Sequence, residues 1–361
     1  MPSRIYLDHA ATTPLRPVAR AAMVDAFGHW ANPSSPHAEG RAARAVLEDA
    51  RVRIADLLGW RGAILFTSGA SEGIAMVMAR AVAGRRIVSR VEHDAVRRMS
   101  EGAVSLPVGA DGRVTDVGLA LALEQAGSQA GEAPLVAVQL VNSETGVIQP
   151  TNAIGAAVSA AGGLWLCDAT QAVGKMDLPD ADFIAFSAHK FGGPPGVGAL
   201  LVRDLGTLVP SGGQEQGYRG GTENLPSVAG MAAALAEGPG WIERVAELRA
   251  HLDGAIEEAG GEIVARDAPR LPTIASYRMP GMPAAAQLIR FDSAGFAVSA
   301  GSACSSGSLK PSHVLAAMGM DSVAASEVIR VSFGRTTRRE DVWRFADQWR
   351  AIAADARARA A

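Results

Sequence analysis

The chain has 361 residues, of which 48% are apolar and 20% charged, and its formal net charge at pH 7 is −3. This balance is typical of a soluble globular protein large enough for two domains, and it argues against a nucleic-acid or membrane surface built on bulk electrostatics. The two cysteines, Cys167 and Cys304, exclude a disulfide framework and a four-thiolate zinc site. Because the first residues contain no apolar signal segment, we expect a cytoplasmic protein with reduced thiols.

The first half of the chain alternates between strand and helix patterns. A short strand is expected within residues 5–14, followed by helices at about 17–28 and 38–58 and by a strand at 63–66 that turns directly into a helix reaching about residue 82. Further patterns lie at 86–89, 94–101, 104–107, 116–126, 134–141, 151–161 and 163–167. This alternation predicts an α/β fold with a mostly parallel central sheet covered on both faces.

The pattern changes after residue 202. A glycine-rich stretch at 211–224 precedes one long predicted helix from about 226 to 259. The order beyond it is strand, strand, helix, strand, a Gly/Ser loop, helix, strand and helix, which is typical of a smaller α+β domain. We therefore expect a large domain at 15–243 and a small domain built from 1–14 and 244–361.

One lysine occupies a position where lysines are unusual. Lys190 lies between two apolar strand patterns, 182–186 and 199–202, and is followed by four glycines and two prolines. Burial lowers the pKa of an ammonium group, and such an amine can form a Schiff base with an aldehyde cofactor. An ordinary surface lysine in a turn between strands explains this segment equally well.

The stretch 68–71 is a candidate phosphate site. It stands where a strand ends and a helix begins, so free N–H groups, the helix dipole and the hydroxyls of Ser68 and Ser71 would meet there. A plain helix cap has the same signature. The chain contains neither GxxxxGK[ST] nor GxGxxG, which excludes a Walker loop and weakens a nicotinamide dehydrogenase interpretation.

Polar residues follow several of the predicted parallel strands. Asp168 ends an apolar strand, where a carboxylate can pair with a protonated pyridine nitrogen or merely cap the next turn. His93 and Gln171 occur at the same kind of place, and their recurrence favours a site at this edge of the sheet. Cys167 is predicted to be a core cysteine. The histidines show no HxxH or HExxH spacing, which argues against a metal.

The last third of the chain adds a thiol and an arginine. Cys304 lies in a loop of small residues, 301–308, where a thiolate can be exposed and can move. Arg330 lies inside the apolar strand pattern 328–333 and needs a partner there. A substrate carboxylate and an intramolecular Asp or Glu are equally compatible with the sequence.

Together these stretches resemble the cysteine desulfurases of the class V aminotransferase family. The matching segments occur in the family order over nearly the whole chain: 6–14, 67–70, 92–93, 141–146, 168–175, 187–190, 219–224, 301–304 and 329–330. The joint match is highly specific, although each segment alone is a weak signal. The resemblance implies a type I pyridoxal-phosphate fold and a homodimer.

The resemblance also implies roles for individual residues. Lys190 would hold pyridoxal 5'-phosphate as a Schiff base, Asp168 would pair with the ring nitrogen and His93 would stack on the ring, with Lys190, Cys304 and His93 as the catalytic set. Gln171 and Asn142 would bond the phenolic oxygen, and Arg330 with Asn142 would bind the substrate. The implied phosphate ligands are Ala70, Ser71, Ser187, His189 and, from the second subunit, Thr222.

The implied reaction converts L-cysteine into L-alanine and leaves a persulfide on Cys304 for a sulfur-acceptor protein. Ser71 stands where the family usually has Thr, and Gly73-Ile74 replace a polar helix start. The chain ends about thirty residues after Arg330, without the longer extension that housekeeping members use to dock an iron–sulfur scaffold, so the acceptor and its pathway stay open. Two alternatives remain: a selenocysteine lyase on the same scaffold, and a sulfur-carrier partner without catalysis, against which the intact Lys190, Asp168 and His93 argue.

Overall fold

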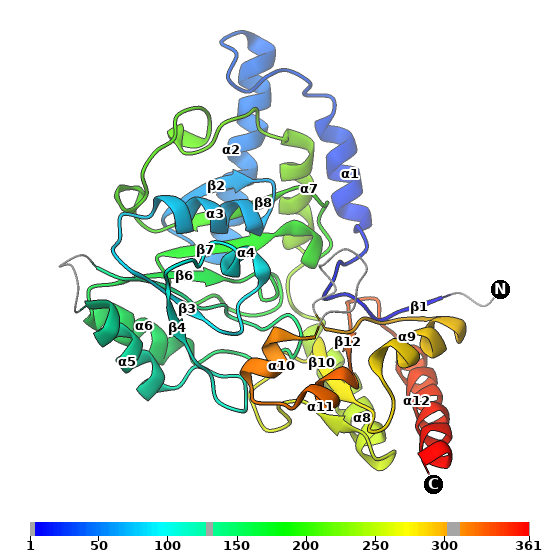
Figure 1. Ribbon diagram of the computed structural model, residues 1–361. Coiled ribbons are helices and arrows are strands. Elements are labelled where there is room, and N and C mark those ends of the chain that lie inside the picture. Colours follow the sequence, from blue (N-terminus) through cyan, green and yellow to red (C-terminus); the bar gives the residue numbers. More distant parts are fainter. Residues whose placement is uncertain (1–3, 128–132, 302–310, 361) are drawn as a thin grey trace.

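The computed structural model describes residues 4–127, 133–301 and 311–360, and a seven-stranded sheet forms its centre (Figure 1). The strand order is β2-β8-β7-β6-β5-β3-β4. Only β8 runs antiparallel to its neighbours among these seven strands. The expected α/β fold with a mostly parallel sheet is therefore confirmed. The strands are β2 (Ala63–Thr67), β3 (Arg86–Ser89), β4 (Val104–Leu106), β5 (Leu135–Ala137), β6 (Leu164–Asp168), β7 (Phe183–Ser187) and β8 (Gly198–Val202).

Helices cover both faces of this sheet because successive strand residues point to opposite sides. In β2, Ile64 and Phe66 join a buried cluster with five helices, whereas Leu65 joins a second cluster with two. The first group is α1 (Pro17–Ala26), α2 (Ala38–Leu58), α5 (Asp116–Gly127), α6 (Thr151–Ala160) and α7 (Leu225–Leu235), and the second is α3 (Ala70–Arg80) and α4 (Asp94–Arg97). Each fully buried Val, Leu, Ile or Phe stabilises the fold by about 1.5–3 kcal/mol.

A smaller α+β region lies below the sheet in Figure 1. Its antiparallel strands are ordered β12-β10-β9, and the N-terminal β1 pairs in parallel with β11. Ile5 and Leu7 share a core with residues from 245 to 356, in which Phe291 stacks on Phe345 at 4.7 Å between ring centroids. The two ends of the chain are thus held together by one hydrophobic core. The division into domains at residues 14 and 243 stays a prediction.

The elements of this region are β1 (Ile5–Tyr6), α8 (Ile242–Glu258), β9 (Glu262–Ile263), β10 (Ile274–Arg278), α9 (Ala284–Ser293), β11 (Phe296–Ala297), α10 (His313–Ala317), α11 (Ser322–Ser326), β12 (Val328–Ser332) and α12 (Arg339–Ala360). Across the described ranges, no helix combines the length and the apolar character needed to cross a membrane.

The single long helix expected at 226–259 is wrong. The structure has two helices here, α7 ending at Leu235 and α8 beginning at Ile242. Gly238 adopts a left-handed φ of 64°, and Pro239 follows it without a backbone N–H to continue the helical ladder. The apolar periodicity continues across this break, which is why the pattern alone suggested one helix. The helix expected at 94–101 is also shorter, since α4 covers only four residues.

Candidate active site

A cavity of about 360 Å³ lies at the carboxyl ends of the parallel strands. It is lined by side chains from β6, β7, β12 and the starts of α3 and α4, together with the backbone that follows β1. The structure brings nine of the predicted site residues together around it: Ala70, Ser71, His93, Asp168, Gln171, Ser187, His189, Lys190 and Arg330. Their assigned roles stay predictions, but their convergence from five separate segments is an observation.

Lys190 is presented by a short 3₁₀ turn, η1 (Ala188–Lys190), that follows β7 directly. Its Nζ donates hydrogen bonds of 2.7 Å to the carbonyl oxygens of Ala10 and Ala11. The small side chains of these two residues let the backbone after β1 approach the amine closely. Lys190 is therefore oriented by two carbonyl oxygens from the N-terminal segment and is not an ordinary surface lysine.

Asp168 and Gln171 lie on one turn at the end of β6. Asp168 Oδ1 accepts a hydrogen bond of 2.9 Å from the backbone N–H of Thr170, so the carboxylate caps this turn while it also lines the cavity. Gln171 Nε2 donates to the Ala10 carbonyl oxygen at 2.9 Å. The Ala10 carbonyl oxygen thus accepts hydrogen bonds from both Gln171 and Lys190 and holds them at the carboxyl ends of the strands.

A second carboxyl group, Glu92, lies behind Asp168. Its Oε1 accepts a hydrogen bond of 2.8 Å from the Gln139 backbone N–H. Burial raises the pKa of Glu92 well above its ordinary value, the Gln139 hydrogen bond works against this, and the nearby Asp168 raises it further. A protonated Glu92 adds no second negative charge beside Asp168. The sequence signalled Glu92 only as a neighbour of His93.

The candidate phosphate site combines the N-terminus of α3 with the end of β7. The Ala70 backbone N–H donates to Ser187 Oγ at 2.7 Å. A Cβ at Gly198, on the adjoining strand, would lie 2.2 Å from the Phe186 carbonyl oxygen and 2.8 Å from the Gly69 Cα. Glycine at 198 is therefore required for β8 to pack this closely against the loop that begins α3. The result is a compact cradle of N–H and hydroxyl groups.

His189 lies beside this cradle. Its Nδ1 is 3.1 Å from Thr12 Oγ1. Burial and, to a smaller extent, the positive charges of Lys190 and Lys175 lower the pKa of His189 to about 4. The imidazole is consequently neutral at pH 7 and acts as a hydrogen-bonding group rather than a cation.

His93 and Asn142 differ in how they relate to the cavity. His93 begins α4, and its Nδ1 accepts a hydrogen bond of 3.2 Å from the Ala95 N–H while the ring lines the cavity. Asn142 is buried and is absent from the cavity wall, since its Oδ1 accepts the N–H groups of Glu144 and Thr145 at 2.9 and 3.0 Å. This local turn after the strand holds the Asn142 amide, to which the resemblance assigned contacts with the cofactor and the substrate.

Arg330 reaches the cavity from β12 in the smaller region. Its Nη2 donates to Asp8 Oδ1 at 2.8 Å and its Nη1 to the Ser143 carbonyl oxygen at 3.0 Å. Asp8 is held in turn by Ser299, whose hydroxyl donates to Oδ2 at 2.7 Å. Of the two partners that the sequence left open for Arg330, the intramolecular carboxylate is present. Asp8 was not identified from the sequence as the partner, because it lies 322 residues away.

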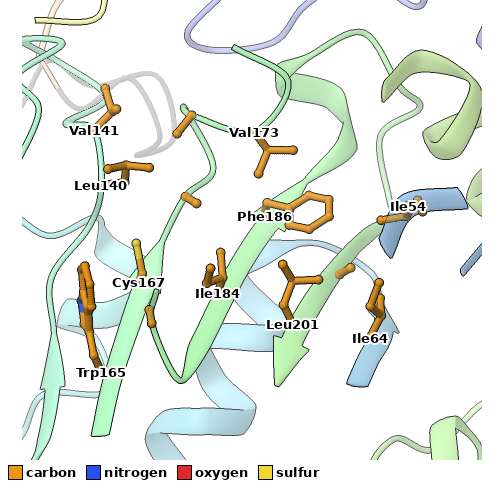
Figure 2. Close-up of a cluster of buried hydrophobic side chains, with 14 of the residues drawn as sticks. Ile54, Ile64, Leu140, Val141, Trp165, Cys167, Val173, Ile184, Phe186 and Leu201 are labelled. Atoms are coloured by element: carbon orange, nitrogen blue, oxygen red, sulfur yellow. The ribbon is translucent and has the colours of Figure 1, made fainter. Parts of the chain in front are cut away.

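The remaining predicted site residues lie elsewhere. Thr222 is exposed on the loop before α7 and does not line the cavity of its own chain. Cys304 lies outside the described residues. Cys167 is completely buried in the hydrophobic cluster of β6, β7 and β8, as Figure 2 shows, and burial raises the pKa of its thiol well above the ordinary value. The prediction of a structural Cys167 is confirmed.

The residues around the cavity fit a polar ligand that carries both donors and acceptors. Three buried polar atoms on its wall have no hydrogen-bond partner within the described part of the chain, namely Thr170 Oγ1, Gln171 Oε1 and Arg330 Nε. Buried polar atoms are normally satisfied, so these three call for a bound group. An amine, a carboxylate and a cradle of N–H and hydroxyl groups on one wall match the functional groups of pyridoxal phosphate.

Comparison with known sequences gives a family match over almost the whole chain. The family model described as Aminotransferase class-V matches residues 5–345. An IscS-like cysteine desulfurase from Mycobacterium tuberculosis is 39% identical, with 93% of each chain covered. A cysteine desulfurase from a Frankia species is 37% identical, with 95% of this chain and 90% of the relative covered.

Solved structures show the same fold. A NifS-like protein from Rickettsia africae superposes with a TM-score of 0.88 at 29% identity, covering 97% of this chain and 99% of that one. SspA in complex with cysteine superposes with a TM-score of 0.77 at 30% identity, covering 92% of this chain and all of the other. The names of these relatives point to chemistry on cysteine, and the residues that line the cavity are compatible with it.

Proposed function

The chain belongs to the class-V aminotransferase family, and we propose that it is a cysteine desulfurase dependent on pyridoxal 5'-phosphate. It converts L-cysteine into L-alanine and transfers the sulfur to Cys304 as a persulfide. The observation that carries the proposal is the convergence of Lys190, Asp168 and Arg330 on one cavity, since these are an amine, a carboxylate and a guanidinium from three distant segments.

Residues that line the cavity could bind each part of the cofactor. Lys190 would bind it covalently through Nζ, and the Asp168 carboxylate would pair with its protonated ring nitrogen. His93 would stack on the ring, and Gln171 would hydrogen-bond its phenolic oxygen. Its phosphate would be held by Ala70, Ser71, Ser187 and His189, supplemented by Thr222 of the partner subunit. The bound cofactor supplies an electron sink for the bonds at the substrate Cα.

The chain's own residues perform the remaining tasks. Arg330 binds the substrate carboxylate while Asp8 and Ser143 keep the guanidinium in place. Lys190 holds the proton that leaves Cα and later returns it. The Cys304 thiolate attacks the substrate sulfur: an S–S bond forms, the C–S bond breaks, and the carbon fragment keeps that electron pair and takes up a proton on its way to alanine.

We also propose a homodimer. Thr222 is exposed and remote from its own chain's cavity, as expected for a residue that completes the site of a partner subunit. The segment at α1 leaves large apolar side chains exposed, among them Phe27 at 65% and Trp30 at 80%. Such side chains are more readily explained by a second subunit than by solvent. A sulfur-acceptor protein and a cytoplasmic location stay predictions.

The proposal is tested by exposing the purified protein briefly to cysteine, then measuring alanine and locating the sulfur by mass spectrometry of its peptides. We expect alanine to form and the mass of one sulfur atom to be added to the peptide containing Cys304. The Cys304→Ala variant should retain cofactor and bind cysteine but form no persulfide, although it can keep some selenocysteine cleavage. Cys167→Ala is the matched control, which should still form the persulfide on Cys304. Sulfur on Cys167, or full turnover by Cys304→Ala, would contradict the mechanism.

A further inference from the structure

Lysine is rare in this chain. Of its 34 basic residues that are Lys or Arg, only Lys175, Lys190 and Lys310 are lysines. Arginine stays protonated in every protein environment, whereas a buried lysine readily loses its proton. Among the described residues, lysine therefore occurs at two positions only: Lys190 lines the candidate active site, and Lys175 shares a neighbouring cavity with it.

Lys175 is brought to Lys190 by the turn that follows β6. The Lys175 backbone N–H donates to the Ala172 carbonyl oxygen at 2.9 Å, which closes the last turn of the segment that begins at Asp168. Gly174 has a φ of 74°, and a Cβ there would lie 3.3 Å from Phe191 Cβ. Because glycine permits both the backbone conformation and this close approach, the Lys175 segment packs against the residue that follows Lys190.

The two lysines line a second cavity, of about 120 Å³, on the far side of Lys190 from the main one. Its wall is largely apolar, with Leu235, Trp241 and Phe333 among its residues, and no Asp or Glu contributes to it. Lys175 is 7% exposed and forms no ion pair with any described carboxylate. A buried ammonium on such a wall, with no described counter-charge, is poorly stabilised.

The other charged groups around this cavity do not neutralise Lys175. Arg16 donates to Glu237 Oε1 at 2.6 Å, so the Glu237 carboxylate is paired with Arg16, and Arg335 donates to the Glu237 backbone carbonyl oxygen at 3.0 Å. His9 is neutral, since burial and then the charge of Lys175 lower its pKa to about 4. The titratable and charged groups facing Lys175 are thus Lys190, His9, His189, Arg16, Glu237 and Arg335.

Electrostatics agrees with this geometry. Burial and, to a smaller extent, the positive charge of Lys190 lower the pKa of Lys175 to about 7. Interactions between titrating groups are reciprocal, so a proton on Lys175 must equally disfavour a proton on Lys190. Near neutral pH the two amines therefore hold fewer protons than two isolated lysines would.

We propose that Lys175 is a positioning residue that controls the protonation of Lys190 across their shared cavity, so that the nitrogen of Lys190 stays reactive near neutral pH. The inference rests on the proposed function, because it takes Lys190 to be the cofactor-binding lysine. Lys175 does not line the main cavity, so it acts on that site through its charge, which reaches Lys190 and His189. Arginine could not replace it as a titrating group, since its charge would be permanent.

The first test reads the titration of Lys175 directly. Holoenzyme labelled with ¹³C at the lysine Cε atoms contains only three labelled side chains, so their NMR signals can be assigned with single-lysine variants and followed against pH. We expect the Lys175 signal to titrate with a midpoint of about 7. A midpoint close to the ordinary lysine pKa of about 10.4 would overturn the proposal. This measurement does not depend on turnover, so a failure of the proposed function would be recognised separately.

The second test asks whether Lys175 acts on Lys190. The pH midpoint of the visible absorption change of resting holoenzyme is compared in wild type, Lys175→Met and Lys175→Arg. Loss of the amine should raise the midpoint by about one pH unit or more, a tenfold change in proton affinity, whereas the permanent charge of arginine should keep it low. Arg344→Met, which removes a positive charge from the exposed side of α12, is the control and should leave the midpoint unchanged. Equal midpoints in wild type and Lys175→Met would overturn the proposal.

Discussion

Two pairs of residues with the same kind of ionisable group lie at the candidate active site. Glu92 lies behind Asp168, and Lys175 lies behind Lys190. Asp168 and Lys190 line the main cavity, whereas Glu92 and Lys175, the backing residues, do not. Burial favours the neutral form of both backing residues, raising the pKa of Glu92 and lowering that of Lys175 to about 7. Burial therefore disfavours a second charge in each pair.

The pairs differ in how firmly the backing residue is held neutral. Glu92 accepts a backbone hydrogen bond of 2.8 Å from Gln139 and is almost completely enclosed. Lys175 lies beside a largely apolar cavity, and with a pKa of about 7 its amine is partly protonated near physiological pH. The comparison indicates a fixed acidic side and a basic side that responds to pH. Substitutions in the two pairs can break or refine this picture.

The largest effect is expected for the cavity-lining lysine. Lys190→Ala should abolish conversion of cysteine to alanine and remove the visible absorption of the holoenzyme, because Lys175 faces the other cavity and cannot substitute for it. The measurement is alanine formation together with the absorption spectrum. Arg344→Ala, on the exposed side of α12, is the control. Residual turnover of cysteine by Lys190→Ala would show that the two amines are interchangeable, and the comparison would fail.

The corresponding change on the acidic side should be smaller. Asp168→Ala leaves the ring nitrogen of the cofactor without its counter-charge, and removing one partner of a buried charge pair costs about 2–5 kcal/mol. We expect a rise of about 30-fold or more in the dissociation constant for pyridoxal phosphate, measured by fluorescence titration of protein from which the cofactor has been removed. The folded content by circular dichroism should be unchanged. If Asp168→Ala bound the cofactor as tightly as wild type, Asp168 would serve only as the cap of its turn.

The difference between the two sides also explains what the sequence could and could not predict. Asp168, His93 and Lys190 were found because each follows a strand that local patterns reveal. The partnership of Arg330 with Asp8 was not found, since it depends on tertiary contact between residues at opposite ends of the chain. The roles of Glu92 and Lys175 were not predicted for a similar reason. Their pKa values depend on burial in the folded protein, which the neighbouring residues in the sequence do not reveal. The break at Gly238 was missed because apolar periodicity runs across it.

The third prediction concerns the stability contributed by Lys175. Its folded-state pKa of about 7 lies below the ordinary value of 10.5, so the unfolded chain binds the proton more tightly. Folding stability should therefore increase as pH rises from about 7 to about 10, and below pH 7 the buried amine should cost on the order of 5 kcal/mol. Lys175→Met should remove this dependence and be more stable than wild type at pH 6. The measurement is urea unfolding of holoenzyme at fixed protein concentration, and a Met variant less stable at pH 6 would contradict it.

The smallest effect should come from Glu92, and its sign is opposite. Its folded-state pKa lies above the ordinary value of 4.5, so the folded chain binds the proton more tightly than the unfolded chain. Wild type should consequently lose stability as pH rises above about 4.5, by up to about 1.4 kcal/mol per pH unit for one proton. Glu92→Gln retains a carbonyl oxygen that can accept the Gln139 N–H but cannot ionise, so its unfolding free energy should fall less steeply with pH between 5 and 8. The double variant, which lacks both groups, should show neither the fall with pH from Glu92 nor the rise above pH 7 from Lys175. Parallel curves for wild type and Glu92→Gln would mean that Glu92 is already ionised in the fold, and that the acidic pair carries two charges rather than one.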